Sequence, residues 1–241
     1  MTLTPFDRTA ITVVEPGWEL SPYNHFDELA QACEWAGRTC YKSEHRITDE
    51  SAPKFCHNLL DRKHPHESVI EHANLTVKII CSRSCSHQLV RHRIAAYSQE
   101  SQRFCDYGKK GLQIICPPSI GVPVGQYEVR QSSTSNTLLC DPFLKDVNQR
   151  DYMYTAYRTY RQYLVYRERG IKAEDAREVL PNATKTEVVS TFNLRTWRHI
   201  FRERALNPAA QWQIRGIFHG ILAQFILRAP SLFGDLLETE N

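Results

Sequence analysis

Two stretches of alternating polar and apolar residues most constrain the fold of this chain. They are HANLTVKIICS at 72–82 and TKTEVVSTFN at 184–193, and both are rich in β-branched residues. This pattern is typical of half-buried strands. The segments around them have helical spacing, without a regular strand–helix–strand alternation. The sequence therefore predicts an α+β fold, in which an antiparallel or mixed sheet packs against several long helices.

Helices are predicted where apolar residues recur every three to four positions. Asn24 is a candidate N-cap for the first helix, and Gly170 is placed to close the longest one. Pro53 is tolerated in the first turn of the second helix. The predicted helices cover 25–41, 51–63, 142–169, 173–180, 194–206 and 209–227, and CSHQLVRHR at 85–93 is also expected to turn helical.

The stretch at 105–137 is rich in glycine and proline and contains the polar run QSSTSNT. This composition predicts a loop excursion. The preceding segment, IAAYSQESQRF at 94–104, is expected to be irregular. No linker-like composition divides the chain, so we expect a single domain over 1–241.

Charge and cysteine content limit the class of partner. The formal net charge of +3 is too small to argue for nucleic-acid binding by itself. No apolar run approaches the ~20 residues that span a bilayer, and the first residues lack a signal-peptide pattern. The eight cysteines include no Cys-x-x-Cys pair, which is typical of free thiols in a reducing compartment. We therefore expect a cytoplasmic protein without a metal site that binds neither nucleic acid nor membrane.

A run of basic residues, Arg91-His92-Arg93, precedes a polar run that contains Ser101 and ends at Arg103. Arginine presents a planar fork of donors that binds phosphate at two points, and serine hydroxyls with loop N–H groups complete such a site. The cluster is therefore a candidate phosphate cradle. Three adjacent basic residues are more often a solvated turn, and the residues alone leave both interpretations open.

A second basic group lies on the helix predicted at 194–206. Arg195, Arg202 and one of Arg198 or His199 share a helix face at three-to-four spacing. A solvated basic helix is the ordinary interpretation. However, apolar segments flank this helix, and buried arginines need anionic partners. Because few acidic residues are near in the sequence, a bound anion is a candidate partner.

Together these clusters resemble the flavin-dependent thymidylate synthases. That family carries Arg-His-Arg, seven residues and then Ser, and this chain reads RHR-IAAYSQE-S. The segments HPHESVIEH, CSHQLVRHR, AREVLPN, FNLRTWRHIFRER and AQWQIR are also similar to the family's blocks, in the family's order. The resemblance covers roughly 24–104 and 138–230.

The resemblance implies two ligand sites. Its FAD site consists of His66, Ser68, Glu71, Arg91, His92, Arg93, Ile94, Gln99, Asn193, Arg195 and His199. Its deoxyuridylate (dUMP) site consists of Gln88, Arg91, Gln99, Glu100, Ser101, Gln102, Arg103, Arg177 and Arg204. Ser101 and Arg103 would bind the nucleotide phosphate, and Arg204 would be catalytic, stabilising the ionised N3 of uracil.

The resemblance also implies the reaction. In this family dUMP is reductively methylated to dTMP, with 5,10-methylenetetrahydrofolate as carbon donor, FAD and NADPH as the source of reduction, and no protein nucleophile. A fixed guanidinium in a water-poor site stabilises developing negative charge without proton exchange, which fits that chemistry. The family is homotetrameric, with active sites shared between subunits.

This sequence departs from the family pattern at three places. Gln99 stands where many members carry Glu, and Phe104 stands where Tyr is common. One extra residue precedes Gln211. Each change affects a contact expected from the family rather than the assignment of Arg204.

Three other functions remain alternatives at this point. A thymidylate synthase with a cysteine nucleophile would use Cys116 or Cys105, but the apolar IICPP context of Cys116 would raise its pKa. A related one-carbon transfer, such as hydroxymethylation of a pyrimidine nucleotide, would use the same site. An arginine-rich nucleic-acid-binding module would show more charge, with aromatic residues interleaved on an open surface.

Overall fold

The structure is a computed structural model that describes residues 8–62, 65–131 and 138–240. Contacts divide the chain into two compact units. Unit 1 consists of Met1–Pro16, Ile80–Ser86 and Gln99–Glu187, and unit 2 consists of Gly17–Ile79, His87–Ser98 and Val188–Asn241. Strands β3 (Asn74–Ser82) and β8 (Lys185–Asn193) each run from one unit into the other. Both were predicted as strands, and both predictions are confirmed.

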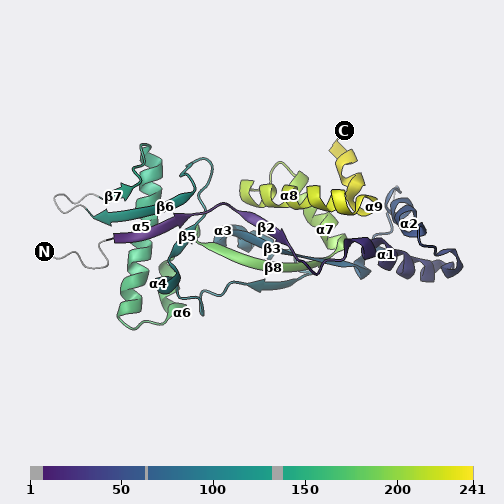
Figure 1. The fold of residues 1–241 in the computed structure, drawn as a ribbon, viewed down its shortest axis with the longest axis horizontal. Helices are drawn as coiled ribbons and strands as arrows, with labels where there is room; N and C mark the ends of the chain where they lie inside the picture. The colour runs from purple at the N-terminus through teal and green to yellow at the C-terminus, as the bar shows by residue number, and fades with distance from the viewer. Residues whose placement is uncertain (1–7, 63–64, 132–137, 241) are drawn as a thin grey trace. The chain divides into compact units, whose positions relative to one another are not determined.

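Unit 1 is built on a mixed sheet with the strand order β5-β1-β6-β7. β1 (Arg8–Val13) pairs in parallel with β5 (Leu112–Ile114) and antiparallel with β6 (Gly125–Gln131). β6 in turn pairs antiparallel with β7 (Leu138–Asp141). The long helix α5 (Val147–Glu168) crosses one face of this sheet (Figure 1).

The prediction of a loop excursion at 105–137 is therefore wrong for the described residues. This stretch contains helix α4 (Tyr107–Lys110), β5 and β6. Its glycines and prolines mark the turns between short strands, and residues far away in the sequence supply the pairing partner. In β6, Tyr127 and Val129 pair with Ile11 and Thr9, and their buried side chains join the core of unit 1.

A side-chain cap fixes the start of α5, and a glycine follows its end. The helix begins at Val147 rather than at 142, because the Asp146 carboxylate accepts hydrogen bonds from the N–H groups of Asn148 and Gln149 at 2.8 and 3.1 Å. Gly170 follows the helix with φ +79°, in the left-handed region that favours glycine. After it come α6 (Ala173–Ala176) and the 3₁₀ turn η3 (Arg177–Val179).

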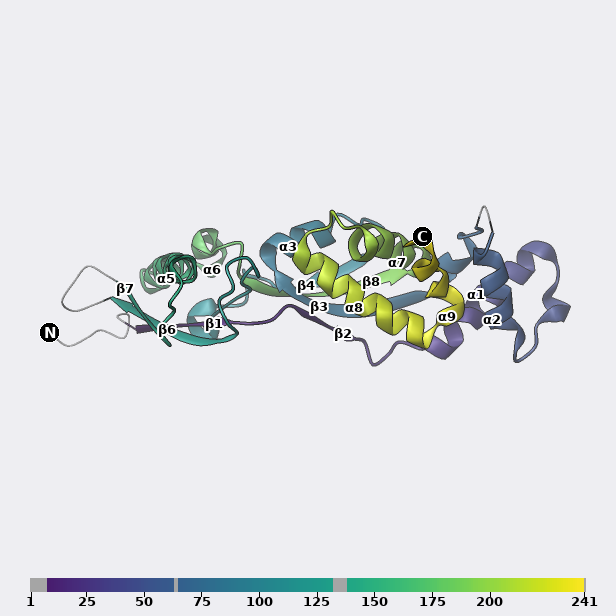
Figure 2. The ribbon, with the colours of Figure 1, turned by 90° about the horizontal axis from the view of Figure 1, so that it is seen from above.

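The second sheet has the strand order β2-β3-β8-β4, with β2 at Gly17–Leu20 and β4 at Ala96–Gln99. The segment at 94–104 was expected to be irregular, so its strand β4 is a correction: pairing, rather than local pattern, makes it a strand. Helices α7 (Leu194–Ile200) and α8 (Trp212–Arg228) cover one face of this sheet (Figure 2). Helix α3 (Arg83–Leu89) follows β3 directly.

An aromatic core holds α7 and α8 together in unit 2. The ring of Trp197 lies 4.9 Å from that of Phe225 and 4.7 Å from that of Phe192, and all three side chains are buried. The indole N–H of Trp197 donates to the Leu75 carbonyl of β3 at 3.0 Å, which satisfies its polar atom in the core. This contact fixes the start of α7, which carries several site residues.

The remaining helices of unit 2 come early and late in the chain. They are α1 (Phe26–Tyr41), the 3₁₀ turn η1 (Glu44–Arg46), α2 (Ser51–Leu60), the 3₁₀ turn η2 (Val69–His72), α9 (Pro230–Phe233) and the 3₁₀ turn η5 (Gly234–Glu240). Asn24 does not cap α1, because His25 occupies the N-cap position. The Asn24 side chain instead pairs with the backbone of Thr76, accepting from its N–H at 2.9 Å and donating to its carbonyl at 2.8 Å.

The α+β class is confirmed, with strands and helices that follow one another in an irregular order along the chain. That the whole chain is one domain stays a prediction. No helix in the described residues is long and apolar enough to cross a membrane.

Candidate active site

A pocket of about 590 Å³ opens in unit 2 where three segments meet. One segment leads to η2, one follows α3, and one forms the first turns of α7. The pocket is lined by Glu67, Glu71, Arg91, His92, Arg93, Ile94, Asn193, Arg195, Thr196, His199 and Arg202. The structure thus brings together most of the residues that the resemblance assigned to FAD, from positions more than 100 residues apart.

Three lining residues were not among those assigned to FAD, although Arg202 was part of the second basic group. Glu67 lies between two residues that were predicted, in the block HPHESVIEH, and Arg202 lies three positions after His199. Thr196 follows Arg195, and its backbone N–H donates to the side chain of Asn193 at 2.8 Å. All three lie within the sequence blocks HPHESVIEH and FNLRTWRHIFRER, and this position was the signal that could have indicated them.

Three predicted FAD residues lie outside this lining. The Nδ1 atom of His66 is 2.9 Å from the hydroxyl of Tyr41, so its ring is tied to the end of α1. Ser68 is exposed and stands at the N-cap of η2. Gln99 belongs to unit 1.

Arg204 lies on an irregular turn of helix. The helix predicted at 194–206 changes after Ile200 into a π-helix over Phe201–Leu206. Such wide turns occur often at functional sites, because they move one side chain out of the regular helical register. The Nε–H of Arg204 donates to Nε2 of His92 at 3.2 Å, so the first Arg-His-Arg cluster and the second basic group are in direct contact.

His92 is suited to accept this bond. Burial lowers its pKa to about 4, with further lowering from the positive charge of Arg204 and from His199. The imidazole is therefore neutral at pH 7, and its Nε2 lone pair is available to the guanidinium. The His199 ring packs edge-on against it at 5.9 Å.

The acid partners of the second basic group come from distant segments. Glu67 lies 3.8 Å from Arg195, 3.4 Å from Arg198 and 3.2 Å from Arg202. Glu71 accepts a further hydrogen bond from Arg195 at 2.6 Å. The prediction that a bound anion would balance these arginines is therefore corrected in part, because two carboxylates of the protein already pair with them.

Of the two candidates for the shared helix face, His199 lines the pocket and Arg198 does not. Arg198 is fully buried behind the pocket wall. Its guanidinium binds the Asp235 carboxylate, at 2.7 Å for Nη1, and the Leu232 carbonyl. A buried charge requires such pairing, and the sequence did not indicate it because Asp235 is 37 positions away.

In unit 1, Glu174 brings two predicted dUMP residues together. Its carboxylate pairs with Nε of Arg103 at 3.0 Å, and its backbone carbonyl accepts from Nε of Arg177, also at 3.0 Å. The Ser101 hydroxyl accepts from the N–H of Arg103 at 3.2 Å. Glu174 therefore contacts both Arg103 and Arg177, and Ser101 contacts the backbone of Arg103.

Gln99 and Glu100 are held by other polar groups of unit 1. The Gln99 amide nitrogen donates to the hydroxyls of Ser86 and Thr186 at 3.0 and 3.2 Å. A glutamate at this position would have to accept from both hydroxyls instead. Glu100 is paired with Lys185 at 3.5 Å.

The other predicted dUMP residues differ in burial. Gln102 is buried, whereas Gln88 is half-buried in unit 2. Gln88 lies in the same unit as Arg91 and Arg204, while 99–103 and Arg177 belong to unit 1.

The candidate thiol Cys116 does not provide an activated nucleophile. Burial raises the pKa of Cys116 above its ordinary value, which lowers the fraction of thiolate at neutral pH. This agrees with the expectation from its apolar sequence context. Cys105 is half-buried, with its sulfur 3.5 Å from Nζ of Lys110.

The pocket of unit 2 therefore combines arginine forks, imidazoles and an amide with the exposed apolar side chain of Ile94. This is the composition of a site for a phosphorylated ligand with a flat ring, such as a nucleotide cofactor. The neutral His92, which lines this pocket, holds the half-buried Arg204 beside it. A fixed positive charge in such a position is typical of an enzyme that stabilises a developing anion.

Comparisons with known proteins identify the family. The family described as "Thymidylate synthase complementing protein" matches residues 23–231. The flavin-dependent thymidylate synthase of Pyrococcus furiosus is 32% identical over 214 residues, which are 85% of this chain and 78% of that protein. That of Geobacter sulfurreducens is 33% identical over 218 residues, covering 88% and 83%. This chain belongs to the flavin-dependent thymidylate synthase family, as its motifs had indicated.

Solved structures show the same fold. Thymidylate Synthase X from Helicobacter pylori, crystallised with FAD and dUMP, matches with a TM-score of 0.64 at 19% identity, covering 91% of this chain and 98% of that one. The UMP/dUMP methylase PolB from Streptomyces cacaoi, bound with 5-Br dUMP, matches with a TM-score of 0.72 at 20% identity, covering 94% and 97%.

Proposed function

We propose that this protein methylates dUMP to dTMP, with 5,10-methylenetetrahydrofolate as the carbon donor and FAD and NADPH as the source of reduction. The observation that carries the proposal is the contact between Arg204 and His92 at the edge of the arginine-lined pocket. Family membership supports the reaction, and the contact supports the role of Arg204 within it.

The residues of the pocket fit FAD. Arg91 and Arg93 offer guanidinium groups for its pyrophosphate, and Arg195 offers the part of its guanidinium that Glu71 does not bind. Asn193 offers an amide, and Ile94, whose side chain is 72% exposed, offers an apolar surface for a flat ring. When bound there, the reduced flavin supplies the hydride that completes the methyl group. His66, Ser68 and Gln99 remain proposed FAD contacts.

We assign Arg204 the role of stabilising negative charge on the uracil. A guanidinium is a permanent charge, so it stabilises a developing anion without exchanging a proton. The neutral His92 ring orients the guanidinium through Nε and leaves its terminal nitrogens free for the substrate. A positively charged histidine would repel Arg204. The low pKa of His92 therefore keeps the ring neutral and able to accept the hydrogen bond from Arg204.

We assign the nucleotide phosphate to the cluster of Ser101, Arg103 and Arg177. Glu174 keeps Arg103 and Arg177 within reach of one anion. A phosphate that replaces Glu174 as the partner of Arg103 forms a charge-assisted, two-point interaction. Gln88, Arg91, Gln99, Glu100 and Gln102 complete the proposed dUMP contacts.

We further propose that the protein is a homotetramer with active sites shared between subunits, and that it works in the cytoplasm. Large apolar side chains beside the site residues are exposed in the single chain, including Ile94 at 72% and Phe104 at 83%. Such side chains are typical of a surface that another subunit covers. The eight free cysteines favour a reducing compartment.

The test combines a spectrum with a product assay. Purified protein should show flavin absorption that NADPH bleaches, and should convert dUMP with methylenetetrahydrofolate into a product with the mass of dTMP. A product with the mass of hydroxymethyl-dUMP would instead establish the related one-carbon transfer. A colourless protein that binds nucleic acid with a steep salt dependence would refute the enzyme assignment altogether.

A further inference from the structure

A second concave surface of unit 2 has a strongly basic lining. This basic groove, of about 640 Å³, lies between the end of α1, η1 and α2. The cations on its lining are Arg38, Lys42, Arg46, Lys54 and Arg62, whereas the carboxylate on its lining is that of Glu50. None of these residues has a role in the function proposed above.

Three of these cations are free to bind an anion. Arg38 pairs with Glu34 at 2.9 Å, and Arg62 donates from Nε to the Asn58 carbonyl at 2.9 Å. Lys42, Arg46 and Lys54 are exposed and make no ion pair within the described part of the chain. Lys42 ends α1 with φ +48°, a backbone conformation unusual for a residue with a side chain. Lys42 lies at the C-cap of α1, Arg46 in η1 and Lys54 in α2, so the three cations come from three different segments of the groove lining.

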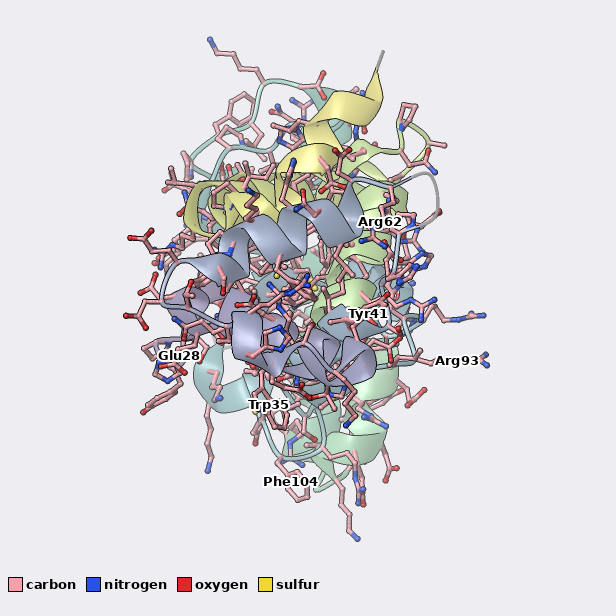
Figure 3. All side chains as sticks on the ribbon, turned by 90° about the vertical axis from the view of Figure 1, so that its right-hand side faces the viewer. Glu28, Trp35, Tyr41, Arg62, Arg93 and Phe104 are labelled. Carbon is pink, nitrogen blue, oxygen red and sulfur yellow. The ribbon has the colours of Figure 1, made fainter. Side chains whose placement is uncertain are left out.

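His66 connects the basic groove to the pocket of unit 2 to which we assigned FAD, called the flavin pocket below. The hydroxyl of Tyr41, on the groove lining, is 2.9 Å from Nδ1 of His66, and the N–H of His66 donates to the Leu59 carbonyl at 3.3 Å. The next residue, Glu67, lines the flavin pocket. Figure 3 shows Tyr41 and Arg62 on the same side of unit 2 as Arg93, which extends outward from that side.

A ligand with a ring at the flavin and a chain of separate negative charges fits this arrangement. Folate co-substrates have this form, because their ring end must lie near the flavin during carbon transfer and their other end carries γ-linked glutamates, each with a free carboxylate. Exposed lysine and arginine side chains from different segments match such a row of carboxylates. A single compact phosphate would instead favour converging arginine forks, as in the flavin pocket.

We propose that the basic groove binds the oligo-γ-glutamate tail of the folate co-substrate, through Lys42, Arg46 and Lys54. The inference rests on the proposed function for the identity of the co-substrate. It adds a binding site outside the FAD and dUMP residues. Binding depends on exposed charges, so it weakens as salt concentration rises.

The test compares folates with one and with five glutamates. In the flavin-loaded wild-type protein, KM for methylenetetrahydrofolate should be roughly tenfold lower for the pentaglutamate than for the monoglutamate, as expected for a few exposed charge pairs. In the double variant Arg46→Gln/Lys54→Gln the ratio should fall to near one. The matched control Lys145→Gln/Arg158→Gln removes the same charge from exposed positions of unit 1 and should keep the wild-type ratio.

Equilibrium dialysis of mono- and pentaglutamyl folic acid against the same proteins measures the tail preference without turnover. Absence of thymidylate formation by the wild type would refute the proposed function, while dialysis would still report on the groove. Equal affinity for both folates, or a preference that survives in the double variant, would overturn the proposal.

Two further readouts separate the folate tail from phosphates. If the double variant instead lost its preference for NADPH over NADH, or lost bound FAD, the groove would be a phosphate site and the proposal would be wrong. Thermal unfolding checks that the double variant is folded. Should it unfold, the single variants Arg46→Gln and Lys54→Gln give the same comparison with about half the effect on a logarithmic scale.

Discussion

The guanidinium of Arg204 donates a hydrogen bond from Nε to the Nε2 atom of His92, across 112 positions of the chain and a distance of 3.2 Å. This bond ties the π-helix after α7 to the Arg-His-Arg segment after α3. It aligns a permanent positive charge at the pocket and requires a neutral histidine. The chemistry proposed for the site therefore depends on both residues.

Replacing Arg204 should affect turnover far more than flavin binding. We expect Arg204→Ala to lose roughly 10²–10³-fold in kcat, as removal of one fixed donor to a developing anion does. The absorption spectrum should still show bound flavin. Arg204→Lys keeps the charge but loses the planar fork, so its kcat should lie between those of the wild type and Arg204→Ala. Near-wild-type kcat for the alanine variant would refute the role of Arg204.

The stability of the fold should depend on His92 in acid. Its folded pKa of about 4 lies below the ordinary value of 6.5, so the unfolded chain binds the proton first. The contribution of neutral His92 to the free energy of unfolding is fully present above pH 6.5 and is lost as the pH falls through 4. Urea unfolding of wild type and His92→Gln between pH 8 and pH 4 should show a flatter pH dependence for the variant. An NMR titration that found His92 charged at pH 6 would contradict this prediction.

Arg103 should contribute mainly to nucleotide affinity. Loss of a charge-assisted phosphate contact of about 1.5–3 kcal/mol predicts a roughly 10–100-fold weaker dUMP Kd for Arg103→Ala. The control Arg158→Ala removes an exposed arginine from α5 in the same unit and should bind dUMP normally. Isothermal titration calorimetry measures both. An unchanged Kd for Arg103→Ala would refute the assignment of the dUMP phosphate to this cluster.

The ion pair between the fully buried Arg198 and the half-buried Asp235 should contribute to stability. Asp235→Asn leaves Glu67, 3.4 Å from Nε, as the remaining carboxylate partner of the fully buried Arg198, and we expect a loss of roughly 1.5–3 kcal/mol in the free energy of unfolding. Chemical denaturation measures the loss. Glu203→Gln, on an exposed residue of the same helical segment, is the control and should change stability by less than about 0.5 kcal/mol.

The thiols should be dispensable for the reaction. Cys116→Ala should keep its turnover, because burial raises the pKa of this thiol and no step assigned to the site needs a protein nucleophile. Steady-state assays with the variant, alongside Cys105→Ala, measure this. Complete loss of activity in a correctly folded Cys116→Ala protein would favour a cysteine-dependent mechanism instead.

Local patterns in the sequence determined the parts of the fold that are self-contained. Strands β3 and β8 and the long helices were predictable, because period-two and three-to-four spacing reflect one buried face. Strands β1, β4, β5 and β6 were missed or taken as loop. They are short, and they become strands through pairing with residues far away, as Tyr127 of β6 does with Ile11 of β1.

The same division applies to the site. The motif Arg-His-Arg, with Ser101 and Arg103, and the ordered blocks were enough to indicate the family and most of the pocket lining. They did not reveal that Glu67 pairs with the arginines of α7, that Arg198 is buried against Asp235, or that Glu174 joins Arg103 to Arg177. Residue type and spacing record which chemistry is available. Which charges meet, and therefore which arginines remain free for a ligand, is decided only when the tertiary structure brings distant segments within hydrogen-bonding distance.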